Sequence, residues 1–157
     1  MIKKGLSRQT GFTLIELLVV LAIIGILITI STFGLQGARE VARDKKRLSD
    51  LESFKAVFEL HRADCLRYPD ATNNGIMPTT IRGYANSGIC RTSNIYMDTV
   101  PNDPQYPGRY YVYRRPTATT YVLCAALENP PNPPMNVSDC GRNCGSGINC
   151  NYIDRGI

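Results

Sequence analysis

The chain has 157 residues, with six cysteines, one histidine and a formal net charge of +5. That length suits one small domain with accessory segments and excludes two full domains. Three of the eighteen basic residues, Lys3, Lys4 and Arg8, precede the first apolar run, so the net charge gives no support for a nucleic-acid partner.

Residues 12–33 form an apolar run that contains a single charge, Glu16. As a helix this run would extend about 33 Å, enough to cross a hydrocarbon core of ~30 Å. A secretory signal has a shorter apolar run and a small-residue cleavage site, and a soluble helix apolar on every face needs a far larger protein around it. A plain membrane anchor fits the length but leaves Glu16 unexplained, because a carboxylate inside a span is costly and marks a functional site.

Gly11 ends a short basic segment directly before Phe12. A cut between Gly11 and Phe12 would create an α-amino group one helical turn from Glu16. In a parallel array of identical helices, Glu16 of one subunit would neutralise the new amine of its neighbour. This pairing supplies a reason for one carboxylate in an otherwise apolar segment.

The string from Gly11 to Val20, GFTLIELLVV, resembles the class III signal of type IV pilins and type II secretion pseudopilins. The resemblance implies cleavage after Gly11 by prepilin peptidase, N-methylation of Phe12, and a role for Glu16 in assembly. It also implies a single-pass inner-membrane protein with its C-terminal head outside, served by an inner-membrane assembly platform. The assembled product would be an extracellular or periplasmic filament of identical subunits.

Residues 36–68 continue with apolar side chains at helical spacing. The apolar stripe contains Val41, Leu48, Leu51, Phe54, Val57 and Phe58. We expect one helix on the order of 50 residues that stops before Pro69, with charged residues such as Asp44 and Asp50 on a solvated face. His61 lies in the same segment and is expected at the surface or its boundary, without a catalytic or ligand role.

Residues 110–115 and 121–127 are rich in β-forming side chains, and residues 116–120 between them are expected to connect a hairpin. One face of the second run can pack on the helical stripe, which predicts an α+β fold. The expected organisation is a leader at 1–11, a hydrophobic helix at 12–35, an amphipathic helix at 36–68, a loop and β-sheet head at 69–127, and a tail rich in Pro, Gly and Cys at 128–157.

All of the cysteines follow the apolar run: Cys65, Cys90, Cys124, Cys140, Cys144 and Cys150. An even set on one side of a membrane span predicts disulfides formed in an oxidising compartment. Zinc is the alternative because the last three cluster, but they contain no CxxC pair and the one histidine is remote. We expect three intramolecular disulfides, with Cys65–Cys90 closing the loop after the helix and the other pairings left open.

The sequence contains no catalytic or nucleotide-binding motif, so no enzyme activity and no cofactor are expected. Asp98, Asp103 and Asp139 are candidates for calcium, as in the acidic loops of major pseudopilins, but no EF-hand spacing supports this and capping of turns is the commoner role of such aspartates. Tyrosines beside Arg109, Arg114 and Arg115 suggest stacking of single-stranded DNA, but alternating tyrosines on a half-buried strand usually pack in a core.

Three functions are consistent with these observations. The first and preferred one is a structural subunit of a type IV pilus, serving adhesion, motility or DNA uptake, which the six cysteines and the Pro-rich tail favour. The second is the major pseudopilin of a type II secretion system, because residues 101–104 followed by Tyr111-Val112-Tyr113 are similar to the Pro-x-Asp-Pro loop and Tyr-x-Tyr strand of those proteins. The third is a membrane-anchored enzyme or receptor that shares only the anchor.

Overall fold

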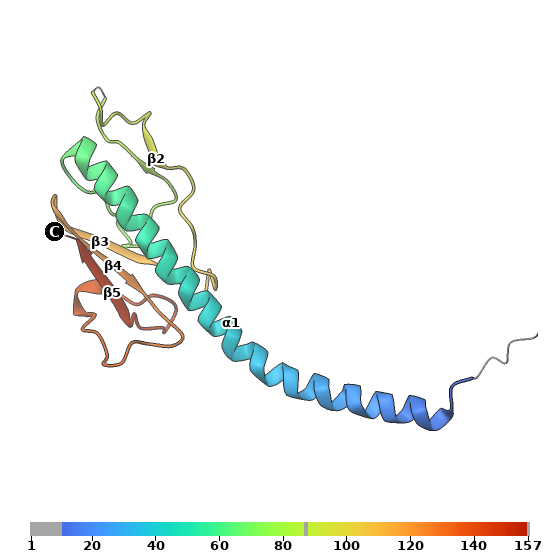
Figure 1. The fold of residues 1–157 in the computed structure, drawn as a ribbon. Helices are drawn as coiled ribbons and strands as arrows, with labels where there is room; N and C mark the ends of the chain where they lie inside the picture. Colours follow the sequence, from blue (N-terminus) through green and yellow to red (C-terminus); the bar gives the residue numbers. More distant parts are fainter. Residues whose placement is uncertain (1–10, 87, 157) are drawn as a thin grey trace, which may run out of the picture. The chain divides into compact units, whose positions relative to one another are not determined.

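The computed structural model describes residues 11–86 and 88–156, with the side chains of residues 32–34 left out of the description. In chain order the elements are α1 (Leu14–Cys65), β1 (Ile81–Arg82), β2 (Ile95–Met97), β3 (Val112–Thr117), β4 (Thr120–Ala125), the 3-10 helix η1 (Ser138–Cys140) and β5 (Tyr152–Gly156) (Figure 1). The chain divides into two compact units, Met1–Arg39 and Glu40–Ile157. We refer to the second unit as the head.

The predicted long helix is confirmed, since α1 is a single helix of 52 residues. It ends at Cys65, short of the predicted limit at residue 68. Leu66 adopts a left-handed conformation with φ of 57°, and its N–H donates to the carbonyl of Arg62 at 2.8 Å. A left-handed residue directly after the last turn terminates a helix by satisfying a carbonyl that has no partner within the helix.

The main sheet is antiparallel, with strand order β3-β4-β5. The predicted hairpin is present as β3 and β4, with Val112 opposite Cys124, and β5 pairs along the other side of β4 with Ile153 opposite Cys124. Pro116 lies within β3, which is an edge strand, and an edge tolerates a residue that has no N–H to donate. A second sheet pairs the short strands β1 and β2. Strands β1, β2 and β5 were not expected from the sequence.

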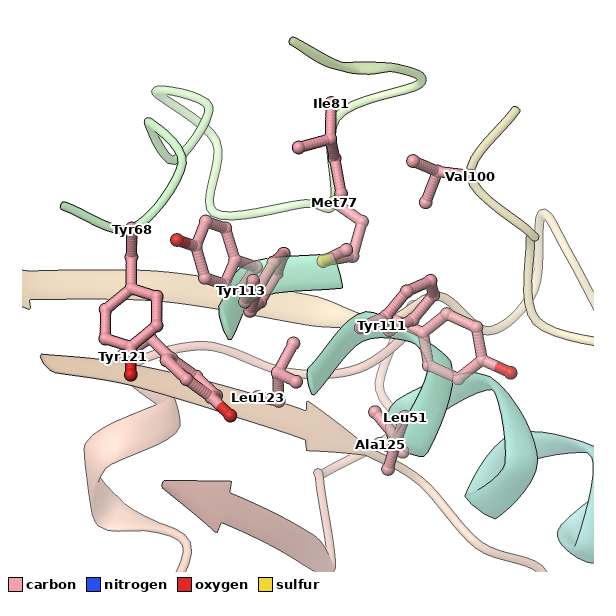
Figure 2. Close-up of a cluster of buried hydrophobic side chains, with 12 residues drawn as sticks. Leu51, Tyr68, Met77, Ile81, Val100, Tyr111, Tyr113, Tyr121, Leu123 and Ala125 are labelled. Carbon is pink, nitrogen blue, oxygen red and sulfur yellow. The ribbon is translucent and has the colours of Figure 1, made fainter. Parts of the chain in front are cut away.

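Alternate residues of β4 enter two different cores. Tyr121, Leu123 and Ala125 lie in a cluster with Leu51, Phe54 and Phe58 of α1. Figure 2 shows Tyr113, Tyr121 and Leu123 of the sheet among the buried side chains of this cluster. The ring centroid of Phe58 lies 4.7 Å from that of Tyr113 and 5.1 Å from that of Tyr121. Aromatic pairs at these separations stabilise a core beyond the area that they bury.

The opposite face of β4 is covered by the cysteine-rich tail. Val122, Cys124 and Ala126 cluster there with Ile153 of β5 and with the cysteines of the tail. The disulfides are Cys65–Cys90, Cys124–Cys140 and Cys144–Cys150. The long helix packs on one face of a small antiparallel sheet, and a tail held by disulfides covers the other face. This arrangement confirms the predicted α+β fold with a disulfide-stapled tail.

Candidate functional site

The N-terminus of α1 is closed by a reciprocal pair of side chains. Glu16 Oε2 accepts hydrogen bonds from the backbone N–H of Thr13 at 3.1 Å and from its hydroxyl at 2.9 Å. In return, the N–H of Glu16 donates to Thr13 Oγ1 at 3.3 Å. This arrangement is a capping box, in which two residues three apart satisfy donors that the helix itself leaves without acceptors.

Capping is a role of Glu16 beyond the one in assembly that was expected from its sequence context. The Thr-x-x-Glu spacing directly before an apolar run was the available signal. Residues 1–10 of the predicted leader, 1–11, lie outside the described residues. Gly11 and Phe12 are described, and both are exposed and precede the helix. Cleavage between them remains a prediction.

The helical part of the first unit carries apolar side chains that no other described segment covers. Leu14 and Ile15 are 81% and 70% exposed, and Phe12, directly before the helix, is 86% exposed. By length and composition α1 contains a segment able to cross a membrane, and none of that segment is buried within the protein. The hydroxyls of Thr29 and Ser31 donate to the carbonyls of Gly25 and Leu27, each at 2.8 Å. Polar groups satisfied inside the helix suit a lipid environment, so motif and helix together suggest a membrane anchor.

Within the head, a buried arginine joins three segments of the chain. Arg47 of α1 is fully buried. Its guanidinium binds both carboxylate oxygens of Asp103, at 2.7 and 3.1 Å, and donates to Asp44 Oδ1 at 2.7 Å. It also donates to Glu128 Oε1 at 3.0 Å and to Gln105 Oε1 at 2.9 Å. Every N–H group of the guanidinium therefore has an acceptor.

The acceptors of Arg47 are themselves held in place. Asp44 accepts hydrogen bonds from the backbone N–H groups of Glu128 and Asn129, at 2.9 and 2.8 Å. Glu128 accepts two hydrogen bonds from Arg43, at 2.6 and 2.5 Å. We call Arg43, Asp44, Arg47, Asp103 and Glu128 the Arg47 cluster. The solvated face predicted for this part of the helix is wrong at Asp44 and Asp50, which are 7% and 2% exposed.

Hydrogen bonds within the Arg47 cluster favour the ionised forms of Glu128 and Asp44. Hydrogen bonds from Arg43 lower the pKa of Glu128 from 4.5 to about 2. Burial opposes ionisation of Asp44, but the hydrogen bonds from Glu128, Asn129 and Arg47 outweigh it and lower the Asp44 pKa. Asp50 lies nearby and accepts from the Tyr111 hydroxyl at 2.8 Å. Burial first, and then this hydrogen bond, raise the pKa of Tyr111.

His61 is buried, which corrects the surface position predicted for it. Its side chain is 1% exposed, and its ring nitrogens lie 2.8 Å from the Arg67 carbonyl and 3.1 Å from the Arg82 carbonyl. Burial lowers the pKa of His61. The ring therefore connects the end of α1 to β1. This is a structural role, and it depends on a contact with Arg82, which is distant in sequence.

Sulfur atoms that would serve as zinc ligands are instead joined in disulfides. Cys65 and Cys90 lie close to His61, and Cys124, Cys140 and Cys150 also lie close together. None of the described cysteines is free. Zinc binds cysteine as the thiolate, so these groups do not offer the expected ligand chemistry in this state.

The aspartates considered for calcium are not gathered at one place among the described residues. Asp103 belongs to the Arg47 cluster, and Asp139 accepts hydrogen bonds from Arg155 at 2.8 and 3.1 Å. Asp98 is exposed.

The residues considered for DNA stacking are engaged within the head. Tyr113 and Tyr121 are buried in the core. Arg115 pairs with Asp70, and Arg109 donates to the carbonyl of Ala126 at 2.6 Å.

Comparison with known proteins gives two kinds of similarity. The family model described as the prokaryotic N-terminal methylation motif matches residues 6–32. Type II secretion system core protein G of Aeromonas hydrophila is 33% identical over 105 residues, which cover 62% of this chain and 68% of the relative. The protein of the same name from Vibrio cholerae is 32% identical over 120 residues, 72% of this chain and 75% of the relative.

The protein of that name from Escherichia coli K12 is 30% identical over 121 residues, 72% of this chain and 77% of the relative. In other relatives the aligned part falls to 60% of their length. No solved structure gave a significant match to the chain. The similarity therefore extends well beyond the N-terminal motif, into the helix and the head.

Proposed function

Because this chain belongs to the family of type II secretion system core protein G, we propose that it is the major pseudopilin of such a system, the repeating subunit of a short filament that acts on exported proteins. The observation that carries the proposal is the extent of the similarity. The methylation motif spans residues 6–32, whereas the relatives align over 105 to 121 residues. A motif shared by pilins and pseudopilins does not separate the two, but similarity that reaches the head favours secretion.

Maturation begins at the non-helical segment before α1. Prepilin peptidase cuts between Gly11 and Phe12, and the new Phe12 amine is N-methylated. The subunit is held in the inner membrane by residues 12–35, with its head on the outer, oxidising side, where the disulfides form. The assembly platform in that membrane then adds the subunit to a growing filament.

Assembly uses the Glu16 carboxylate, which already accepts hydrogen bonds within the separate subunit. Glu16 is held by Thr13 in the capping box. In a parallel bundle of these helices the same carboxylate lies within reach of the Phe12 amine of a neighbour, where it exchanges a local hydrogen bond for a charge pair. Charge-assisted contacts in a low-dielectric surrounding are stronger than neutral ones.

The second candidate function is a type IV pilus subunit, which the sequence analysis preferred. The observation that favours it is the tail, residues 128–157. Two disulfides there stabilise the face of the sheet that lies opposite the helix. A cross-linked head suits a filament exposed outside the cell. The comparisons favour the secretion alternative over this one, because the aligned relatives carry the type II secretion name.

We predict that Glu16→Ala abolishes filament assembly and leaves membrane insertion and the folded head intact. Removing a charge from the span eases insertion by up to about 3 kcal/mol. In the filament it strands the neighbouring amine, at a cost of about 3–5 kcal/mol. Membrane fractionation beside a shearing assay measures the two effects separately, and normal filament yield would contradict the assembly role.

The matched control is Thr13→Val, which removes the hydroxyl of the capping box and keeps the carboxylate. Loss of a cap costs about 1 kcal/mol of helix stability. If Glu16 served only as a cap, Thr13→Val and Glu16→Ala would lose assembly to the same degree. We expect Thr13→Val to assemble.

Deletion of the gene separates secretion from piliation. We expect exported enzymes to accumulate in the periplasm while twitching and surface pili are unchanged. Loss of surface pili with normal secretion would favour the pilus function instead.

A further inference from the structure

Three segments distant in sequence enclose an open groove on the head with a volume of about 760 Å³. Its lining comes from the loop at residues 71–75, from Tyr110 and residues 113–115, and from residues 140–143 with Gly145. The volume lies in the range of sites that hold small ligands. No residue of the groove takes part in the N-terminal assembly site.

The lining is basic and rich in amides. Its charged and amide side chains are Arg114, Arg115, Arg142, Asn73, Asn74 and Asn143. No described lining residue carries a carboxylate. Asparagine both donates and accepts hydrogen bonds, as a sugar hydroxyl does, and a guanidinium binds a carboxylate with two parallel hydrogen bonds. The groove therefore combines donors for hydroxyl groups with donors for acidic groups.

Two of the three positive charges have no ion-pair partner among the described residues. Arg115 pairs with Asp70 at 2.5 Å. In contrast, Arg114 donates to the backbone carbonyl of Asp139 at 2.7 Å, and Arg142 donates to the Tyr110 hydroxyl at 3.1 Å. These acceptors are neutral, so Arg114 and Arg142 keep their charge available to a ligand.

Both arginines lie against glycines that leave room for them. A Cβ at Gly141, where φ is +66°, would lie 2.4 Å from Arg114 Nη1. A Cβ at Gly75, where φ is +63°, would lie 3.3 Å from the Cδ of Arg142. Side chains other than glycine rarely adopt these backbone angles. Glycine at these two positions therefore leaves space for the Arg114 guanidinium and for the Arg142 side chain at the groove.

Disulfides and a backbone hydrogen bond order the segments that line the groove in the absence of a ligand. The Cys124–Cys140 bond fastens the segment that begins at residue 140 to β4, and Cys144–Cys150 closes the same segment on itself. Elsewhere in the lining, the Tyr113 N–H donates to the Gly75 carbonyl at 2.9 Å. A site ordered in advance loses less conformational entropy on binding.

We propose that this groove binds an acidic oligosaccharide, a carbohydrate whose carboxylates meet Arg114 and Arg142 while its hydroxyls meet the asparagines. Nucleic acid fits less well, because base stacking needs an open aromatic face. Tyr113 is fully buried, and the guanidinium of Arg142 covers the Tyr110 ring at 5.2 Å from its centroid. The few apolar lining residues exclude an apolar ligand.

The test uses the full chain in detergent micelles and a fluorescent hexamer of galacturonic acid, with its fully methyl-esterified hexamer as the neutral probe. We expect saturable binding of the acidic hexamer, weakened by added salt, and none of the ester. Arg114→Gln and Arg142→Gln should each weaken binding about tenfold, the loss expected for one charge-assisted contact. Arg91→Gln is the matched control, because Arg91 is also exposed and donates to a backbone carbonyl, that of Gly88.

Asn143→Ala is the second variant, since it alters an exposed amide of the lining without touching the arginines. We expect a severalfold loss of affinity with unchanged thermal unfolding. Equal binding of acid and ester, or unchanged affinity in the Arg114→Gln, Arg142→Gln double variant, would overturn the proposal. So would equal or tighter binding of single-stranded DNA or of a polyglutamate peptide of the same charge.

Discussion

The guanidinium of Arg47 is fully buried, and each of its N–H groups has an acceptor, so it connects the segments that supply those acceptors. Arg47 holds together α1, the loop at residues 103–105 and the segment at residues 128–129. A buried ion pair adds little net stability when compared with apolar residues of the same volume, because both charges lose their water. Removing one partner is different, because the others then remain buried without compensation.

We predict that Arg47→Ala lowers the free energy of unfolding of the head by about 3–5 kcal/mol, the cost of stranding buried charges. Denaturant unfolding of the disulfide-intact protein measures the loss. Lys45→Ala is the control, since Lys45 neighbours the Arg47 cluster in sequence but is exposed. A loss below about 1 kcal/mol in Arg47→Ala would mean that water or other side chains replace the guanidinium.

The same cluster predicts how stability depends on pH. The Glu128 pKa is lowered from 4.5 to about 2 in the folded protein. A lowered folded-state pKa gives stability that is present above the unfolded value and is lost as the pH falls toward the folded value. We expect the free energy of unfolding to fall between pH 4.5 and about 2, by at most roughly 3 kcal/mol from Glu128 and by less after screening. Glu128→Gln should flatten this part of the profile, and an unchanged slope would exclude Glu128 as its source.

At the residue scale, the exposure of several polar side chains was predicted wrongly from the sequence. Asp44 and Asp50 were expected in water because helical periodicity separates an apolar stripe from polar positions. His61 was expected at the surface or its boundary because histidine is usually only partly buried. Their partners, Glu128, Tyr111 and Arg82, come from segments far along the chain. Periodicity within one helix contains no information about such contacts.

At the scale of elements, β4 shows why some strands were predictable. Its residues alternate between the helix-facing core and the disulfide-lined core, and the continuous run of apolar, β-forming residues that this requires is visible in the sequence. The strand β5 was missed because it follows a glycine- and cysteine-rich tail and is ordered by pairing with β4. Strands β1 and β2 have two and three residues, too short for a pattern to be recognised.

We predict that the two tail disulfides differ in their effect on stability. Cys124–Cys140 spans 16 residues and Cys144–Cys150 spans 6. In the chain-entropy model the longer loop contributes about 3 kcal/mol and the shorter one about 1 kcal/mol less. Replacing Cys124 and Cys140 by alanine should therefore lower the denaturation midpoint more than replacing Cys144 and Cys150, and the loss of buried sulfur from the core adds to the difference. The reverse order would show that the shorter bond orders more of the tail than its loop length implies.

At the scale of the whole molecule, sequence and comparison contributed different parts of the functional assignment. The N-terminal string was sufficient to predict a pilin-like family, because its single carboxylate and apolar length are rarely combined for another purpose. It was not sufficient to distinguish a pilus from a secretion filament, since that difference depends on the head. Similarity over 105 or more residues to relatives named for type II secretion is the observation that favours the secretion proposal.

The division of the chain into two units leads to the last prediction. Both apolar cores and all of the disulfides lie within Glu40–Ile157. The first unit contributes exposed apolar side chains that need lipid or neighbouring helices to leave water. A chain that starts at Glu40 should therefore form a soluble monomer with three disulfides and a cooperative unfolding transition, whereas the full chain should require detergent. Analytical ultracentrifugation and disulfide mapping after periplasmic expression measure both properties. Aggregation of the shortened chain, or mixed disulfides within it, would mean that the head depends on residues before position 40 for its fold.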